Sequence, residues 1–259
     1  LSYYNSYDFF RYAQEFGYEW RTQLLNFKWN QIWSDRLSSS LSLVSGLYDS
    51  QQFDPVGNDA FSLNNGISYY RGKKNFFFNM NESNSINAGA VFTYYDMSPE
   101  SISKRGELSS IAPLSVEKSQ GYEASVYIND EYTISDRFSL SAGLRYTVYQ
   151  ELGPRTVFNY LSEAPRNPNT VVDSTLFQSG ESIATYSGLE PRIAFKWQLS
   201  ESGSIKLSYN RMQQFIHLIS NTTVATPVDV WQISTNYIPP QIGDNYSIGL
   251  FQNFNENKW

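Results

Sequence analysis

The sequence of 259 residues contains no cysteine, one histidine and only three methionines. Without cysteine there are no disulfides and no thiolate metal sites, and the count also excludes a metal centre built from several His and Cys ligands. His217 is the only histidine that a Ser-His-Asp site could use. Its strand-like Phe-Ile-His-Leu-Ile setting offers no obvious partner, so we expect a structural histidine.

Charge is also scarce. Charged residues make up 17% of the chain, against roughly 25% in soluble domains. The net charge is -6 and the pI is about 4.9, and no basic patch stands out to neutralise phosphates, which argues against a nucleic-acid partner. No run approaches the ~20 apolar residues of a membrane-spanning helix, and the mean hydropathy is -0.45. The chain opens at Leu1 without a recognisable export signal, so we expect a fragment or a processed chain.

The sequence is instead rich in aromatic residues and in uncharged polar residues, and the latter replace charged ones. Aromatics reach 17%, with 20 Tyr, 17 Phe and 6 Trp, and such residues favour β-strands. Ser, Asn and Gln are abundant throughout. Uncharged polar residues suit a surface divided between lipid, which rejects charge, and a wet interior. A secreted β-sandwich or propeller is the alternative class.

Period-two alternation predicts nine strands. Most are longer than the 5–6 residues usual in globular strands, and they match or exceed the 9–11 that a tilted transmembrane strand needs. The predicted ranges are 18–32, 37–50, 66–81, 86–98, 119–132, 137–150, 184–198, 204–219 and 243–254.

Several predicted strands have one apolar and one polar face. Leu37, Leu41, Leu43 and Leu47 alternate with Ser38, Ser40, Ser42 and Gly46; Phe138, Leu140, Ala142, Leu144, Tyr146 and Val148 alternate with Ser139, Ser141, Gly143, Arg145 and Thr147. In a transmembrane barrel the apolar face meets lipid, so Arg145, Arg192 and Lys196 would point inward. In a water-soluble sandwich or barrel the same apolar residues would face the interior and the Ser-rich face would meet solvent.

The links between the strands favour the membrane barrel. Short links near 34–36, 82–85, 135–136 and 200–203 alternate with long links near 51–65, 99–118, 151–183 and 220–242. Up-and-down outer-membrane barrels have tight turns at the periplasmic end and long loops outside. Two places depart from the alternation: Arg71, Lys73 and Lys74 lie inside a strand, and Arg211 shares the parity of the apolar residues before it. A bulge, or strand ends standing above the bilayer, would explain them.

Four segments carry a family resemblance. They are Gly-Leu-Arg-Tyr at 143–146, Leu-Glu-Pro-Arg at 189–192, Ser-Tyr-Asn-Arg at 208–211 and the run 214–221. They resemble TonB-dependent outer-membrane receptors, most strongly over 119–259. Three later segments follow in an order similar to the large nutrient-uptake members of that family: Val230-Trp231, Pro240-Gln241-Ile242 and Ser247-Ile248-Gly249-Leu250. The resemblance implies a 22-stranded barrel closed by an N-terminal plug and driven by a periplasmic energy-coupling protein. Neither plug nor coupling box is recognisable here.

The expected fold is therefore all-β, with residues 1–259 forming part of a single antiparallel up-and-down transmembrane β-barrel in the outer membrane. We expect the middle of a longer polypeptide whose plug and remaining strands lie elsewhere. The expected function is import of a nutrient, which could be a glycan, a peptide or a metal chelate. A passive porin or translocation channel and a secreted all-β adhesion or binding protein are the alternatives. Expected partners are outer-membrane lipid, a TonB-type coupling protein and a possible surface lipoprotein.

We find no catalytic, cofactor or metal site in the sequence and expect no enzyme, and the ligand-contact residues are unknown. The loop acids Asp49, Asp54 and Asp59 lack the spacing of a calcium loop. Asp130 with Glu131, or Glu151 with Glu163, could be imagined as acid and base, although acids occur at strand ends in any barrel. Loop and strand-end aromatics could stack on a ligand or pack the loops; they are Phe158, Tyr160, Tyr186, Trp231 and Tyr237.

Overall fold

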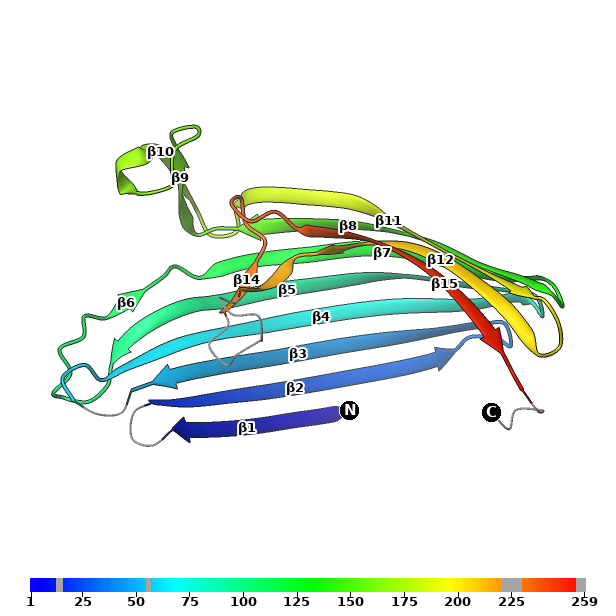
Figure 1. The fold of residues 1–259 in the computed structure, drawn as a ribbon, viewed down its shortest axis with the longest axis horizontal. Coiled ribbons are helices and arrows are strands. Elements are labelled where there is room, and N and C mark those ends of the chain that lie inside the picture. The colour runs from blue at the N-terminus through cyan, green and yellow to red at the C-terminus, as the bar shows by residue number, and fades with distance from the viewer. Residues whose placement is uncertain (13–15, 55–56, 220–229, 255–259) are drawn as a thin grey trace.

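A computed structural model describes residues 1–12, 16–54, 57–219 and 230–254. Ten long strands form one open, curved sheet (Figure 1). They are β1 (Ser2–Tyr12), β2 (Phe16–Ile32), β3 (Leu37–Phe53), β4 (Phe61–Asn81), β5 (Asn84–Lys104), β7 (Ser119–Ser135), β8 (Phe138–Leu152), β11 (Ser182–Gln198), β12 (Gly203–Gln214) and β15 (Gln241–Gln252). The described residues contain no helix that is both long and apolar enough to cross a bilayer.

The long strands form an antiparallel meander, in which every long strand after β1 is paired with the long strand before it. Tight turns connect them at one end, which we call the short-turn end. The links at the other end, the long-loop end, include three excursions. These contain β6 (Leu114–Ser115), the hairpin of β9 (Arg155–Tyr160) and β10 (Val171–Phe177), and the hairpin of β13 (Ile216–Ile219) and β14 (Val230–Ile233). The all-β, up-and-down prediction is confirmed.

The observed strands differ from the predicted ranges in several places. β5 runs to Lys104, although a link was predicted from 99. The first strand, Ser2–Tyr12, was missed because aromatic residues occupy both of its faces, so no alternation is visible. β4 begins at Phe61, which shortens the predicted 51–65 link. The predicted strand 204–219 ends at Gln214, because Phe215 is buried and the chain turns away into β13.

The sheet has an inner face, on which the β13–β14 hairpin packs, and an opposite outer face. The outer face is apolar across the middle of the sheet; its members include Leu25, Phe27, Leu41, Leu43, Phe92, Val126, Ile128, Leu144, Leu189, Ile193, Leu207 and Ile248, which we call the apolar belt. Side chains directly opposite in an antiparallel pair lie on the same face. The predicted apolar faces are thus the outer ones, as lipid contact requires.

Aromatic residues border the apolar belt at both ends. Tyr70, Tyr94 and Tyr122 are opposite one another on three successive strands and form a row nearer the long-loop end. At the short-turn end the ring of Phe138 stacks on Trp197, with centroids 5.9 Å apart. Aromatic bands at both membrane interfaces are expected of a transmembrane barrel.

Large inner-face side chains lie flat over glycines of the neighbouring strand. A Cβ on Gly121 would stand 2.8 Å from the hydroxyl of Tyr149, and one on Gly89 would stand 2.6 Å from the hydroxyl of Tyr127. Glycine at these two positions therefore makes the room in which the tyrosines lie against the wall.

The basic residues that broke the alternation need no bulge. The pairing of β3 with β4 runs without a register shift through Arg71, Lys73 and Lys74, and so does that of β12 with β15 through Arg211. The bulge hypothesis is therefore wrong at both places. Arg71 and Lys73 share the inner parity, because Arg71 is opposite Thr93 and Lys73 is opposite Val91, both of them buried.

Lys74 and Arg211 remain on the outer face, each with a partner. The ammonium of Lys74 donates to Ser39 Oγ at 2.9 Å and lies over the ring of Phe76. Arg211, near the loop end of β12, makes a bidentate pair with Asp244 at 2.8 and 2.9 Å. The position of Arg211 near the loop end of β12 agrees with the other predicted explanation, that this strand end stands above the bilayer.

Candidate functional site

A basic patch lies on the inner face at mid-height of the wall. It surrounds a hollow of about 330 Å³, whose lining includes Arg71, Lys73, Tyr127, Asn129, Arg145 and Arg192. The patch is assembled from β4, β7, β8 and β11. The sequence predicted inward positions for Arg145 and Arg192, whereas Arg71 and Lys73 could be placed only once the strand register was known.

Only one of the four cations of this patch is paired among the described residues. Arg145 Nη2 lies 3.0 Å from Glu123 Oε1, and Arg145 Nε lies 3.7 Å from Glu190 Oε1. The carboxylate of Glu190 is nearly fully buried and also accepts from the hydroxyl of Thr147. Arg71, Lys73 and Arg192 have no ion pair within the described part of the chain. The patch therefore has positive charge available for a ligand.

Above the patch, the β13–β14 hairpin folds onto the inner face of the wall (Figure 1). The ring of Phe215 stacks on Tyr149, with centroids 4.8 Å apart and planes 9° from parallel. Phe215 and Ile233 are buried against three wall residues, Ile67, Tyr95 and Met97. This cluster is the apolar core of the described structure, and it joins a long loop to the wall.

Three polar contacts fix the turn that follows β14. The hydroxyl of Tyr149 donates to the carbonyl of Ser234 at 2.7 Å, and the hydroxyl of Tyr186 donates to the carbonyl of Thr235 at 2.9 Å. The N–H of Asn236 donates to Glu151 Oε2 at 2.7 Å. All three wall groups point to backbone atoms, so the contact depends on the path of the loop rather than on its side chains.

The same turn joins the second hairpin, β9–β10. The hydroxyl of Tyr237 donates to the carbonyl of Phe158 at 2.6 Å and accepts from the N–H of Phe158 at 3.0 Å. The guanidinium of Arg166 lies over the ring of Tyr237, 4.8 Å from its centroid. Arg155, paired with Glu151 at 2.7 Å, lies near the same ring. Two loops far apart in the sequence thus meet at one tyrosine.

His217 lies inside this hairpin and is nearly fully buried. Its Nε2 is 2.9 Å from Ser234 Oγ, a partner that the sequence did not reveal, and its Nδ1 has no hydrogen-bond partner among the described residues. Burial lowers the pKa of His217 below 6.5, because it penalises the charged imidazolium. A neutral histidine beside a serine, with no acid on its other nitrogen, has the contacts of a packing residue.

The structure separates the candidate acid pairs. Asp130 and Glu131 are adjacent on β7 and therefore point to opposite faces. Glu151 is held by Arg155 and Asn236 at the hairpin, whereas Glu163 lies in the β9–β10 loop with a positive φ of 64°. No three His, Asp or Glu side chains gather within metal-binding reach in the part of the chain that the structure describes.

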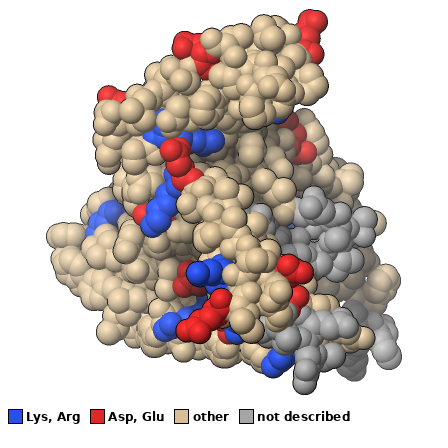
Figure 2. Space-filling view, turned by 90° about the vertical axis from the view of Figure 1, so that its left-hand side faces the viewer, with Lys and Arg blue, Asp and Glu red and all other residues tan. Residues whose placement is uncertain are grey.

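The candidate aromatics, in contrast, gather at the two hairpins. Tyr186 and Trp231 pack against the apolar core around Tyr149, and Tyr160 meets Tyr237 edge to face at 6.2 Å. Figure 2, which looks onto the long-loop end, shows charges of both signs among a mostly uncharged surface. The described part of the loop end therefore has aromatic residues at its hairpins and only scattered charges.

These features define a class: the wall of an outer-membrane β-barrel, apolar outside and polar inside, with loops folded over one end. The sequence matches the family described as "TonB dependent receptor-like, beta-barrel" over residues 1–259. The chain belongs to this family, whose members lie in the outer membrane and work with TonB. No curated protein sequence matches it.

Solved structures show the same fold at low identity. The copper transporter OprC has a TM-score of 0.62 at 11% identity, over 97% of this chain and 43% of that one. The siderophore receptor PiuA from Acinetobacter baumannii has a TM-score of 0.56 at 12% identity, over 94% and 39%. The ferric yersiniabactin uptake receptor FyuA from Yersinia pestis has a TM-score of 0.55 at 10% identity, over 93% and 34%. This chain spans less than half the length of each.

Proposed function

We propose that this chain is the barrel wall of a receptor that imports an anionic metal chelate across the outer membrane, with energy supplied through a TonB-type protein. A plug domain and further strands of the same polypeptide would complete the barrel. In this proposal the wall performs no chemistry. It provides a closed, hydrogen-bonded path through lipid, with an inner surface that accepts a polar ligand.

The observation that carries the choice of ligand is the basic patch. Arg71, Lys73 and Arg192 face the lumen without a carboxylate partner among the described residues. An arginine presents a rigid fork of donors that suits carboxylates and other planar anions, and charge-assisted contacts are the stronger hydrogen bonds. Two of the similar solved structures are named for a siderophore and for ferric yersiniabactin, and a third for copper; the first two agree with a metal chelate in preference to a glycan or a peptide.

The test uses the full-length receptor in a Gram-negative host and ferric citrate labelled with radioactive iron. The variant R71Q/K73Q/R192Q removes the three cations without an ion pair, and R36Q/R137Q, which removes two exposed arginines at the short turns, is the control for loss of positive charge elsewhere on the barrel. We expect uptake at subsaturating chelate to fall at least about tenfold in the first variant, because each charge-assisted contact contributes roughly 1.5–3 kcal/mol. The control should import normally.

Two outcomes would replace the proposal. Ferric citrate uptake that continues after the proton-motive force is dissipated would indicate a passive channel. Saturable uptake of a neutral maltooligosaccharide, with no uptake of ferric citrate, would indicate a glycan receptor. The amount of each variant in the outer membrane is measured in parallel, so that loss of assembly is not mistaken for loss of binding.

A further inference from the structure

A second hollow lies on the inner face of the wall, between the basic patch and the short-turn end. Its volume is about 510 Å³, and its lining includes Glu131, Ser139, Lys196, Lys206 and Phe251. We call it the lysine trough. We propose that it is a second anion-binding station, which receives the imported chelate when the chelate leaves the basic patch. This inference rests on the proposed import of an anionic chelate.

Two lysines lie directly opposite each other on neighbouring strands of the trough. Lys196 of β11 pairs with Lys206 of β12, and both side chains are exposed. Like charges directly opposite in a sheet are destabilising, and residues that break such a local rule occur mainly at functional sites. Neither lysine has an ion pair in the part of the chain that the structure describes. The pair therefore has two positive charges to share with an anion.

The other side chains of the trough leave its net charge positive. Among the described residues that line it, Glu131 is the one carboxylate, and it lies on β7, separated from the lysines by β8. Lys206 Nζ lies over the ring of Phe251, 4.6 Å from the centroid. A ring face attracts a cation without neutralising it. The contact therefore positions Lys206 against the wall while its charge stays available to a ligand.

The lysine trough continues the inner surface of the basic patch toward the short-turn end. Arg192 and Lys196 lie on the same face of β11, four residues apart, which is about 13 Å at 3.3 Å per residue. The row between them consists of Ser141, Ala194 and Ser208, which are opposite one another and carry no charge. The two groups of cations are therefore separate, and the surface between them is short and uncharged.

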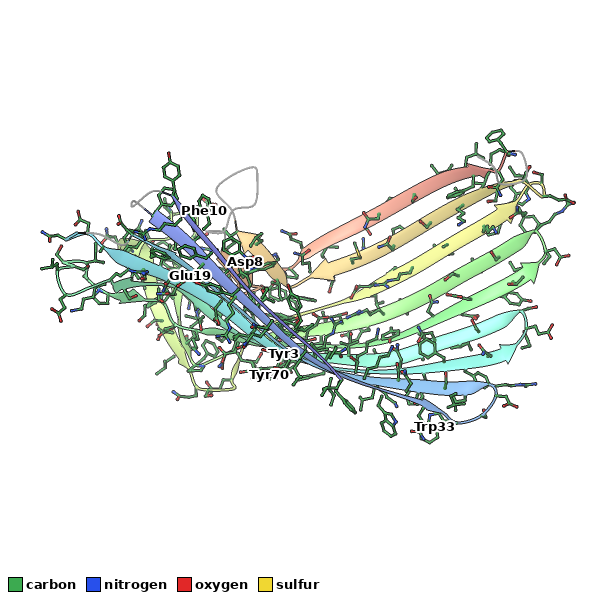
Figure 3. All side chains as sticks on the ribbon, turned by 90° about the horizontal axis from the view of Figure 1, so that it is seen from below. Tyr3, Asp8, Phe10, Glu19, Trp33 and Tyr70 are labelled. Atoms are coloured by element: carbon green, nitrogen blue, oxygen red, sulfur yellow. The ribbon has the colours of Figure 1, made fainter. Side chains whose placement is uncertain are left out.

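The position of the trough gives the direction of passage. Tight turns of outer-membrane barrels face the periplasm, so the short-turn end is the exit side of the wall. In Figure 3, β11, β12 and β15, coloured yellow to red, run side by side to this end, which the labelled Trp33 marks.

An anion that leaves the basic patch for the periplasm must part from Arg71, Lys73 and Arg192. Fixed positive charges raise the local concentration of an anion, so a second group of cations on the way divides this separation into two smaller steps. The lysine trough should therefore raise the rate of passage and leave the affinity of capture to the basic patch.

The experiment uses the full-length receptor in a Gram-negative host and ferric citrate labelled with radioactive iron. K196Q/K206Q removes the lysine pair, and K196R/K206R keeps its charge. R36Q/R137Q removes two cations from the short turns at the same end, outside the trough, and is the control of equal charge. The maximum rate of energised uptake and the affinity of de-energised cells for ferric citrate are measured for each, per molecule of receptor in the outer membrane.

We expect the maximum uptake rate of K196Q/K206Q to fall at least about fivefold, which is about 1 kcal/mol at 1.4 kcal/mol per factor of ten, while its affinity stays within about twofold. K196R/K206R and the control should import at the normal rate. Normal uptake by K196Q/K206Q, or an equal loss in the control, would overturn the proposal. A reduced amount of K196Q/K206Q in the outer membrane, with normal uptake per molecule, would also overturn it, in favour of a contact with the plug.

A second measurement does not depend on which nutrient is imported. S139C places a thiol opposite Lys196. Its reaction with an anionic and a cationic methanethiosulfonate reagent is followed in energised cells, in a receptor without other cysteines. We expect the ratio of the anionic to the cationic rate to be at least about threefold higher in S139C than in S139C/K196Q/K206Q.

The two measurements separate the two proposals. An unchanged ratio of reagent rates would overturn the lysine trough as an anion site. Absence of ferric citrate uptake by every protein, including the unsubstituted receptor, with the expected ratio of rates, would instead overturn the proposed function and leave the trough as an anion site.

Discussion

The two faces of this sheet are built from alternate residues of the same strands, yet they are held by different forces. Outer-face side chains in the apolar belt have no directional partners and need only to be apolar. Many inner-face side chains, in contrast, are held by specific polar partners, as in the Glu123–Arg145–Glu190 group and the contacts of Tyr149, although the cations of the basic patch other than Arg145 are not. A position on the apolar belt therefore requires only an apolar side chain. A position on the inner face requires a side chain whose polar groups reach particular partners. Substitutions of the same kind should therefore have opposite consequences on the two faces.

The largest effect is expected where a buried charge loses its partner. R145M leaves the carboxylates of Glu123 and Glu190 without their shared cation, which should cost about 3–5 kcal/mol in the free energy of unfolding. The triple variant R145M/E123Q/E190Q removes all three charges and should recover most of the loss. Urea unfolding in detergent micelles measures both. Equal stability of the single and triple variants would show that the inner face is as tolerant as the outer one.

A charge in the apolar belt should cost nearly as much. Leu144 is on the outer face of β8, and L144R should destabilise the barrel by about 2–4 kcal/mol and lower its amount in the outer membrane. The control S141R adds the same side chain on the inner face of the same strand and should be tolerated. If S141R proved the more harmful of the two, the assignment of the faces would be reversed.

A smaller effect is expected at the hairpin contact. Y149F keeps the ring stacked on Phe215 but removes the hydrogen bond to Ser234, which should weaken docking of the hairpin by about 1–2 kcal/mol. Hydrogen exchange at residues 230–238 should accelerate about tenfold, while the sheet stays protected. Y146F, on the outer face of the same strand, is the control and should leave the exchange unchanged.

The smallest effect concerns pH. Because burial lowers the pKa of His217 below 6.5, the docked hairpin binds protons less readily than the released one. Docking should be independent of pH above about 6.5 and should weaken progressively as the pH falls below that value. Hydrogen exchange of the hairpin between pH 7.5 and 5 measures this, after correction for the intrinsic exchange rate. H217Q should remove the pH dependence, and its persistence would assign it to another group.

The sequence predicted the sheet better than it predicted the site, for a physical reason. Alternation is a local signal, and it identified the faces of β3 and β8 and the order of short and long links. β1 was not predicted, because aromatic residues on both of its faces hide the alternation. The packing of the two hairpins was not predicted either, because it depends on contacts between residues far apart in the sequence: Tyr149 with Ser234, and Phe158 with Tyr237. Likewise, Arg71 and Lys73 became part of a patch only when β4 was placed beside the other strands.

Tyr237 also has a consequence for how the long loops can move. Its hydroxyl both gives and receives a hydrogen bond at Phe158, and its ring is covered by Arg166, so the β9–β10 hairpin is tied to the turn that follows β14. That turn is itself tied to the wall at Tyr149, Glu151 and Tyr186. The two loops therefore share one degree of freedom while these bonds hold. We therefore expect the two loops to open together rather than one at a time.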